Sequence, residues 1–188
     1  MRIIETERLV LRTWKDDDAK PYFDINQDPK VIEFLPNALT MRQVKDFISA
    51  MNDRYIKNNY TLFAVELKKT GELIGFIGLS YIDWQVPFTP LHEIGWRLGS
   101  LYWGKGYATE GAKAVLNYGF NHCGLEEIVS FTVPMNKRSI RVMEKIGMQH
   151  DRAGDFAHPK LPPDHKLSKH VLYRIKSNLI TEKPHNKS

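Results

Sequence analysis

A short glycine-rich stretch at residues 102–110, Tyr-Trp-Gly-Lys-Gly-Tyr-Ala-Thr-Glu, opens a helix predicted over residues 107–122. Glycine at Gly104 and Gly106 leaves consecutive backbone N–H groups open to a ligand, because no Cβ blocks the approach. The helix that follows adds the positive end of its dipole, so the stretch is suited to holding a phosphate or pyrophosphate. A tight turn that needs glycine for its backbone geometry explains the same residues equally well.

The stretch departs from the common nucleotide-binding motifs. Gly99, Gly104 and Lys105 fit the GxxxxGK part of a P-loop, but Gly106 stands where that motif needs a hydroxyl for magnesium. The GxGxxG fingerprint of Rossmann folds is absent, because Thr109 stands where its third glycine would be. We therefore expect neither kind of nucleotide site.

Working outward, the apolar periodicity alternates between strand and helix. The predicted strands are residues 8–14, 60–67, 73–82, 91–98, 128–133, 148–152 and 169–177, and the predicted helices follow Asp18, Thr40, Gly106 and Asn136. Thr40 and Gln43 have the spacing of a capping box. This order indicates the α+β class with a mixed sheet. A chain of 188 residues that is 42% hydrophobic and 26% charged has the size and composition of one globular domain.

Five passages carry a resemblance to a known family: residues 8–12 (RLVLR), 71–78 (GELIGFIG), 92–96 (HEIGW), 102–110 (YWGKGYATE) and 136–148 (NKRSIRVMEKIGM). From Arg8 to about Lys176 the chain resembles the GNAT (Gcn5-related) N-acetyltransferases, and within them the RimJ/RimL-type branch. The resemblance implies a mostly antiparallel sheet of six to seven strands flanked by about four helices. We expect residues 1–180 to form one such domain and residues 181–188 to be a polar tail.

The resemblance also implies acetyl-CoA as cosubstrate, with no metal. The family loop reads Gln/Arg-x-x-Gly-x-Gly/Ala, and Trp103 replaces its first residue, as is common in the RimJ/RimL-type branch. The implied cofactor-binding residues are Trp96, Arg97 and Leu98 for the pantetheine arm, Trp103, Gly104, Lys105, Gly106, Tyr107, Ala108 and Thr109 for the pyrophosphate, and Asn136 and Arg141. Lys105, Arg138 and Arg141 are candidate side-chain contacts to phosphate, although exposed charge is the rule and favours a solvated side chain for each of them.

The implied reaction is direct transfer of the acetyl group to a primary amine. Glu93 is the candidate general base, and the alternative is a structural carboxylate paired with Arg97. Strand alternation places Glu93, Gly95 and Arg97 on one face. The family commonly has a β-bulge here, which Gly95 would ease. Ser139 is the candidate proton donor to the departing thiolate, since Met143 stands about where many relatives have a tyrosine.

The acceptor is left open between a peptide or ribosomal-protein α-amine and a small-molecule amine. Phe34 and Trp84 are candidate walls of its site, with ordinary loop packing as the alternative. The net charge of +5 suits an anionic partner, and no single stretch carries the excess, so we expect no nucleic-acid partner. The competing function is a non-catalytic acyl-CoA-binding or regulatory module. Many members of the resembling family form homodimers, so a homodimer is a further expectation.

The remaining residue types add little chemistry. The single cysteine, Cys123, excludes an internal disulfide framework. His158, His165 and His170 fit no zinc spacing, so we expect no metal. No apolar leader or membrane-spanning stretch is apparent, which predicts a cytoplasmic protein without membrane contact.

Overall fold

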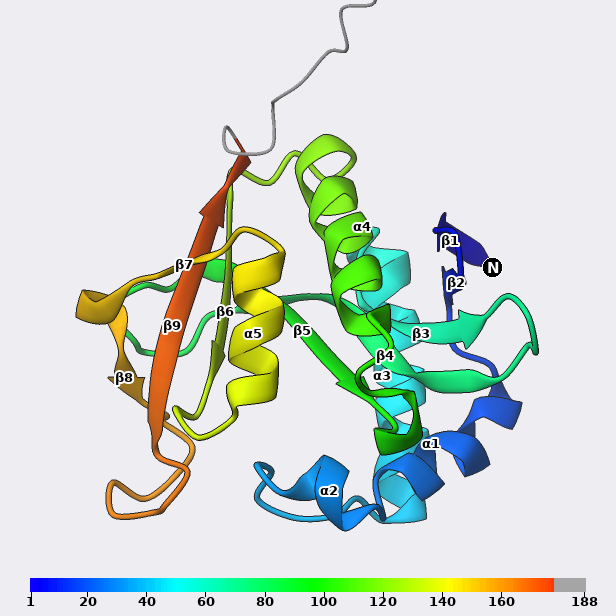
Figure 1. Ribbon diagram of the computed structural model, residues 1–188, viewed down its shortest axis with the longest axis horizontal. Helices are drawn as coiled ribbons and strands as arrows, with labels where there is room; N and C mark the ends of the chain where they lie inside the picture. The colour runs from blue at the N-terminus through cyan, green and yellow to red at the C-terminus, as the bar shows by residue number, and fades with distance from the viewer. Residues whose placement is uncertain (178–188) are drawn as a thin grey trace, which may run out of the picture.

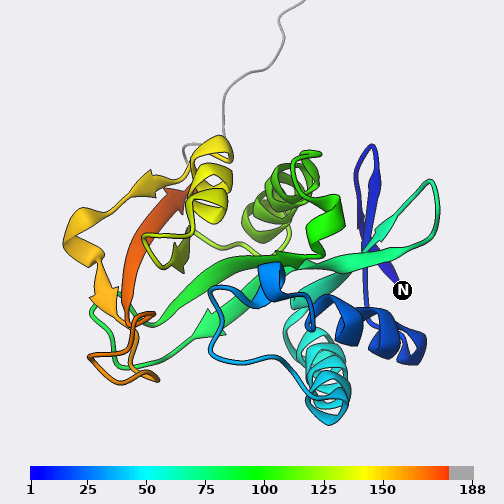
Figure 2. The ribbon, with the colours of Figure 1, turned by 60° about the horizontal axis from the view of Figure 1, so that its bottom comes forward.

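Helices cover both faces of one twisted sheet in this computed structural model, which describes residues 1–177 (Figures 1 and 2). Its strands are β1 (Arg2–Glu5), β2 (Leu9–Arg12), β3 (Leu62–Leu67), β4 (Leu73–Ile82), β5 (Leu91–Leu98), β6 (Glu127–Thr132), β7 (Gln149–His150), β8 (Phe156–Ala157) and β9 (Lys169–Lys176). Their order is β1-β2-β3-β4-β5-β6-β9-β7, and β8 pairs with β9. Neighbours are antiparallel except β5 and β6, which are parallel.

The α-helices divide between the two faces of the sheet. They are α1 (Ala19–Ile25), α2 (Pro29–Ile32), α3 (Met41–Asn58), α4 (Tyr107–Asn121) and α5 (Lys137–Lys145). The apolar faces of α4 and α5 pack on one side in the larger core cluster, while α1 and α3 pack on the other, around Tyr22 and Phe76 (Figure 2). No helix within residues 1–177 combines the length and apolar character that crossing a bilayer requires.

The sequence-based expectations hold for the class and the main elements. The α+β class, the mostly antiparallel sheet, all seven predicted strands and all four predicted helices are confirmed. The structure adds the short strands β1 and β8 and the single-turn helix α2, which brings the described sheet to nine strands. Helix α2 did carry a local signal, because Asp28 caps it and Pro29 is its first residue.

Helix α3 shows how local sequence sets an element. Thr40 accepts a hydrogen bond from the Gln43 backbone N–H while the Gln43 side chain accepts one from Thr40, which is the predicted capping box. The helix ends at Asn59, whose φ of 61° is left-handed. Its apolar stripe of Val44, Ile48 and Met51 is buried.

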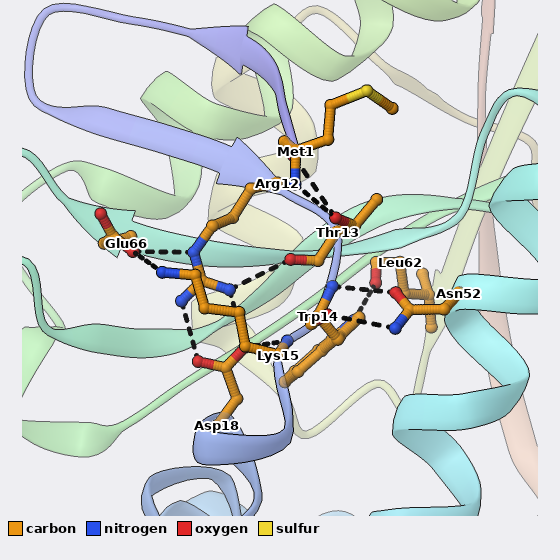
Figure 3. Close-up of polar contacts among 9 residues, drawn as sticks. All are labelled: Met1, Arg12, Thr13, Trp14, Lys15, Asp18, Asn52, Leu62 and Glu66. Carbon is orange, nitrogen blue, oxygen red and sulfur yellow. Dashed lines mark hydrogen bonds and ion pairs between the residues drawn. The ribbon is translucent and has the colours of Figure 1, made fainter.

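A buried arginine joins β2 to β3 and to the turn that precedes α1 (Figure 3). Arg12 is 4% exposed, donates to both carboxylate oxygens of Asp18 at 2.7 and 2.8 Å, and donates to Glu66 at 2.7 Å. Next to it, the Trp14 backbone and the Asn52 side chain exchange hydrogen bonds of 2.9 and 3.1 Å, which attach α3 (Figure 3). Because removing one partner of a buried ion pair strands the other charge, these contacts fix the helices under the sheet.

Strands β5 and β6 separate after a short paired segment, and this separation positions the site. They pair only at His92 with Ile128 and at Glu93 with Val129 within the described chain. Beyond Glu93 the two strands diverge, so the side of β5 from residue 94 onward has no neighbouring strand there. If β6 continued alongside β5, it would form hydrogen bonds with the backbone N–H and C=O groups of β5. Because the strands separate, those groups can instead bind a ligand or side chains.

The β-bulge expected near Gly95 is not formed. Strands β4 and β5 pair in one uninterrupted register, from Gly75 with Leu98 to Ile82 with Leu91. The irregularity of β4 lies instead on its other side, in its pairing with β3 between Val65 and Glu66. The divergence from β6 opens the sheet without a distortion of β5 itself.

All described strands belong to one connected sheet, which supports our proposal that residues 1–180 form a single domain. The end of that range, and the polar tail predicted at residues 181–188, lie outside the described residues.

Candidate active site

A cavity of about 710 Å³ fills the opening between β5 and β6. Its walls come from those strands, from the N-terminal ends of α4 and α5, and from α2 and the segment after it. The predicted site residues that line it are Glu93, Trp96, Arg97, Leu98, Trp103, Gly104, Gly106, Tyr107, Ala108, Thr109, Asn136, Ser139, Arg141 and Phe34. Residues predicted from separate passages of the sequence thus meet around one cavity.

The glycine-rich stretch forms an open turn at the start of α4. Gly104 and Gly106 have φ values of 76° and 84°, which side chains rarely adopt, and a Cβ on Gly104 would meet no atom within 4 Å. Gly106 caps the helix without a side-chain hydrogen bond. Among the described residues, the backbone N–H groups of residues 107–109 have no acceptor. The turn therefore has both properties considered for it, since it needs glycine and it leaves N–H donors open.

A network from the N-terminus supports this turn from behind. The Arg8 guanidinium donates to the Lys105 carbonyl at 2.9 Å and to Glu110 at 2.6 Å, and it lies 4.6 Å over the Tyr107 ring. Thr6 donates to the same Glu110 carboxylate at 2.6 Å. Burial would raise the pKa of Glu110, but the hydrogen bonds from Thr6 and Arg8 outweigh it and hold that pKa below its usual value. Sequence reasoning missed this support.

Trp103 joins the turn to the end of β5. Its indole N–H donates to the Leu98 carbonyl at 2.8 Å, so that carbonyl is already engaged within the protein. The Arg138 guanidinium lies 4.5 Å over the Trp103 ring. Arg138 also donates to Glu33, just after α2, at 2.7 Å. Three segments that surround the cavity are tied together by this one tryptophan and one arginine.

Glu93 lies where β5 and β6 begin to diverge. It is the last residue of β5 paired with β6, opposite Val129, and it faces Ser80 of β4. Burial raises the pKa of Glu93 to about 8. The structural alternative considered from sequence, an ion pair with Arg97, is not formed, because Arg97 instead donates to Asn26 at 2.6 Å. A carboxyl group with this pKa can exchange a proton near neutral pH.

Asn136 and Ser139 lie at the start of α5, on the cavity wall. The Asn136 side-chain oxygen accepts from the Ser139 backbone N–H at 3.2 Å, and its amide donates to Thr132 at 3.1 Å. Asn136 is therefore the helix cap that the sequence offered as an alternative, and it lines the cavity as well. Met143, 1% exposed, closes the cavity one turn further along.

Two predicted residues lie outside the cavity. Trp84 packs behind its wall, with its ring 5.6 Å from that of Phe131 and 4.7 Å from that of His158, so the structure does not place it at the predicted acceptor wall. The Lys105 ammonium lies 5.8 Å from the Tyr102 ring centroid rather than among the lining side chains. Phe34 does line the cavity, together with Val31.

The histidine segment contributes one residue to the cavity. His170 lines it, and its Nδ1 lies 3.0 Å from the Ser168 carbonyl oxygen. His158 packs against His170 with ring centroids 5.1 Å apart, and burial lowers the pKa of His158 to about 4. His158 and His170 therefore belong to an aromatic cluster between the cavity and Trp84.

Known proteins share both the sequence pattern and the fold of this chain. A family model described as "Acetyltransferase (GNAT) domain" matches residues 8–149. The "Uncharacterized N-acetyltransferase p20" of Bacillus licheniformis is 31% identical over 153 residues, which cover 80% of this chain and 84% of that protein. A solved GNAT-family acetyltransferase from Bacillus anthracis superposes with a TM-score of 0.76 at 29% identity and covers 92% of this chain and 97% of its own.

The fold extends to more distant enzymes. Mycobacterium smegmatis RimJ, solved in complex with CoA-disulfide, has a TM-score of 0.73 at 20% identity, with 93% of this chain and 85% of that one covered. At that identity the likeness concerns the fold alone. Because the family model matches residues 8–149 and a relative covered over 84% of its length is 31% identical in the aligned region, the chain belongs to the GNAT family of acetyltransferases.

Proposed function

We propose that the protein is an acetyl-CoA-dependent N-acetyltransferase that transfers the acetyl group directly to a primary amine. One observation carries the proposal: the cavity between β5 and β6 has open N–H donors of a helix N-terminus on one wall and the carboxyl group of Glu93 on another. An anionic cofactor and a proton acceptor are thereby brought to the same space.

The residues present fit acetyl-CoA. The uncapped N–H groups of residues 107–109 suit a pyrophosphate, and Arg138 and Arg141 line the same cavity with positive charge. The unpaired edge of β5 from residue 94 onward suits the amide groups of a pantetheine arm. When bound, acetyl-CoA supplies an activated thioester carbonyl.

The protein's part in the reaction is to move protons and to position groups. Glu93 accepts the proton that the acceptor ammonium must lose before its nitrogen can attack. A carbon–nitrogen bond then forms at the carbonyl and the carbon–sulfur bond breaks. Ser139 donates a proton to the departing thiolate while the attacking nitrogen loses its second proton, and that proton returns to Ser139 through solvent. Glu93 releases the first proton to solvent, which leaves free CoA and the acetylated amine.

The experiment combines binding with turnover. Isothermal titration with acetyl-CoA and with CoA tests the cofactor site, and a free-thiol assay tests transfer to peptides with Ala, Ser and Met N-termini and to a panel of polyamines. We expect binding of both nucleotides and thiol release with at least one amine, accompanied by its acetylated product. Tight CoA binding without turnover on any amine would instead support the non-catalytic acyl-CoA-binding module.

A further inference from the structure

An arginine without a carboxylate partner lies in the wall of the cavity. Arg97 is partly buried, and within residues 1–177 no carboxylate lies within ion-pair distance of its guanidinium. Two other arginines of low exposure are neutralised, since Arg12 pairs with Asp18 and Arg174 pairs with Asp151, whereas Arg54 donates to the Ser80 hydroxyl. Removing a guanidinium from water without an anion costs free energy, so an unpaired one at a cavity marks a place for an external anion.

The guanidinium of Arg97 is held in place by neutral groups. Its Nη1 donates to the Asn26 side-chain oxygen at 2.6 Å, and it lies 5.6 Å over the Phe76 ring. Asn26 is fully buried and is itself fixed, because its amide donates to the Tyr22 carbonyl at 2.6 Å. These contacts orient the guanidinium without neutralising its charge, and its other N–H donors have no acceptor among the described residues.

Arg97 points away from the turn that would hold the pyrophosphate. Its side chain shares a face of the sheet with Phe76, which packs with α1 and α3, whereas α4 packs on the opposite face. Val31, Phe34 and the exposed Lys30 also line the cavity, and Arg97 reaches it from the face of the sheet that α1 and α3 cover. This is the side opposite the cofactor turn, from which an acceptor would enter.

From this geometry we propose that Arg97 forms an anion-binding subsite for the acceptor, so that the preferred acceptor carries a carboxylate at a distance from its reactive amine. The proposal rests on the proposed acetyl transfer. Glu93 and Arg97 lie four residues apart on one strand face, and their Cα atoms are therefore roughly 13 Å apart. Allowing for side-chain reach, the amine and the anion would be separated by roughly 8–12 Å, about three extended residues.

This spacing defines the class of acceptor. The amine and carboxylate of an α-amino acid share one carbon atom, so such a molecule is too short to reach both groups. A peptide with Asp or Glu at its third position, or an ω-amino acid of about eight carbons, is long enough. Both present the same pair of groups, a primary amine and a distant carboxylate.

The test compares matched acceptors in the wild-type enzyme and in Arg97→Gln. The peptide pair is Ala-Ala-Glu-Ala amide and Ala-Ala-Gln-Ala amide, and the small-molecule pair is 8-aminooctanoate and its amide. We expect the wild type to favour one or both carboxylates about tenfold in kcat/KM, and Arg97→Gln to bring that ratio close to one. The pair that shows the preference identifies the source of the anion. Arg97→Lys should keep part of the preference, and Arg42→Gln on α3, at an exposed position, should keep all of it.

Two outcomes would overturn the proposal: a wild-type ratio near one for both pairs, or a ratio that persists in Arg97→Gln, whether or not this variant also loses acetyl-CoA affinity. A binding measurement separates this from failure of the transferase function. Titration of the N-acetylated Glu and Gln peptides into the CoA-bound protein needs no turnover. Binding that favours the Glu peptide and depends on Arg97 supports the subsite even if no amine is acetylated, and equal binding contradicts it.

Discussion

Glu33 and Arg138 form an ion pair of 2.7 Å that joins the residue after α2 to the first turn of α5. Both side chains are about half exposed, and the guanidinium also stacks on Trp103. Arg138 is a predicted phosphate contact, so in this structure a carboxylate holds the group that a cofactor phosphate would use. We therefore predict that binding of acetyl-CoA and the position of α2 are coupled through this guanidinium.

Replacing Glu33 with Gln should strengthen cofactor binding. The substitution removes the carboxylate that competes for Arg138, so we expect acetyl-CoA to bind about two- to fivefold more tightly at low ionic strength. The gain should shrink at about 0.5 M salt, because exposed charges are screened. Titration calorimetry at both salt concentrations measures it. The control is Asp53→Asn, at an exposed position on α3. Equal acetyl-CoA affinity in Glu33→Gln and wild type would contradict a contact between Arg138 and the cofactor phosphates.

The role of Glu93 as a base predicts a specific pH profile. Because its pKa is about 8 and only the carboxylate accepts a proton, wild-type kcat/KM should rise with pH until it levels off above about pH 8. Glu93→Gln should lower kcat/KM by about 100-fold and leave only the ionisation of the acceptor amine in the profile. Steady-state kinetics from pH 6 to 9.5 provide the measurement. A Glu93→Gln enzyme with unchanged kcat/KM across this range would contradict the assignment.

The same residue should make stability depend on pH. Between the unfolded value of 4.5 and the folded value of about 8, Glu93 is protonated in the native state and ionised in the unfolded state. The native state then binds more protons, so the free energy of unfolding falls as pH rises through this window. Glu93→Gln removes this loss and should be more stable than wild type by about 1–3 kcal/mol above pH 8. Urea unfolding at pH 4.5 and 8.5 tests the sign, since the difference should be small at the lower pH.

Glu110 should affect cofactor affinity although it lies behind the turn. Glu110→Gln weakens the contacts of Arg8 and Thr6 that hold residues 104–107, so the open N–H donors lose their fixed arrangement. We expect acetyl-CoA affinity to fall about five- to tenfold, corresponding to the loss of a charged hydrogen bond. Arg2→Gln removes a nearby exposed charge whose ion pair with Glu5 is 3.6 Å long, and it should leave the affinity unchanged. If both variants bind equally well, the network is not required for the turn.

Substitution of Ser139 distinguishes a role in the chemical step from a role in binding acetyl-CoA. If it donates to the departing thiolate, Ser139→Ala should lower kcat by about 10- to 100-fold and raise the KM for acetyl-CoA much less. The backbone N–H of residue 139 still reaches Asn136 in this variant, so the helix cap survives. The reverse pattern, with a raised KM and an intact kcat, would make Ser139 a binding residue only.

The sequence predicted what depends on local patterns. The glycine-rich turn, the capping box of Thr40 and Gln43, and the placement of Glu93 and Arg97 on one strand face follow from spacing alone, and the structure contains all three. The GNAT resemblance read from five short passages is confirmed by the family match.

Contacts between segments that are far apart in the chain could not be predicted from the sequence. The Glu33–Arg138 pair spans 105 positions, and nothing near either residue identifies its partner. Trp84 was predicted at the acceptor wall because its loop lies on that side in the resembling fold, yet the position of a loop does not say which layer its side chains join, and Trp84 packs behind Phe131. Strands β5 and β6 pair at only two positions, and no residue near the end of this pairing indicates in the sequence that the strands separate there.

The contact between Arg8 and Glu110 also has a consequence for how this binding turn comes into being. The two residues are separated by 102 positions, so the chain must close a very large loop before Arg8 can hold the turn. During synthesis, the N-terminal hairpin emerges well before the residues it will support. The geometry of this turn therefore depends on a contact with residues far away in the chain, and an isolated peptide of residues 102–122 would contain the motif without the support that shapes it.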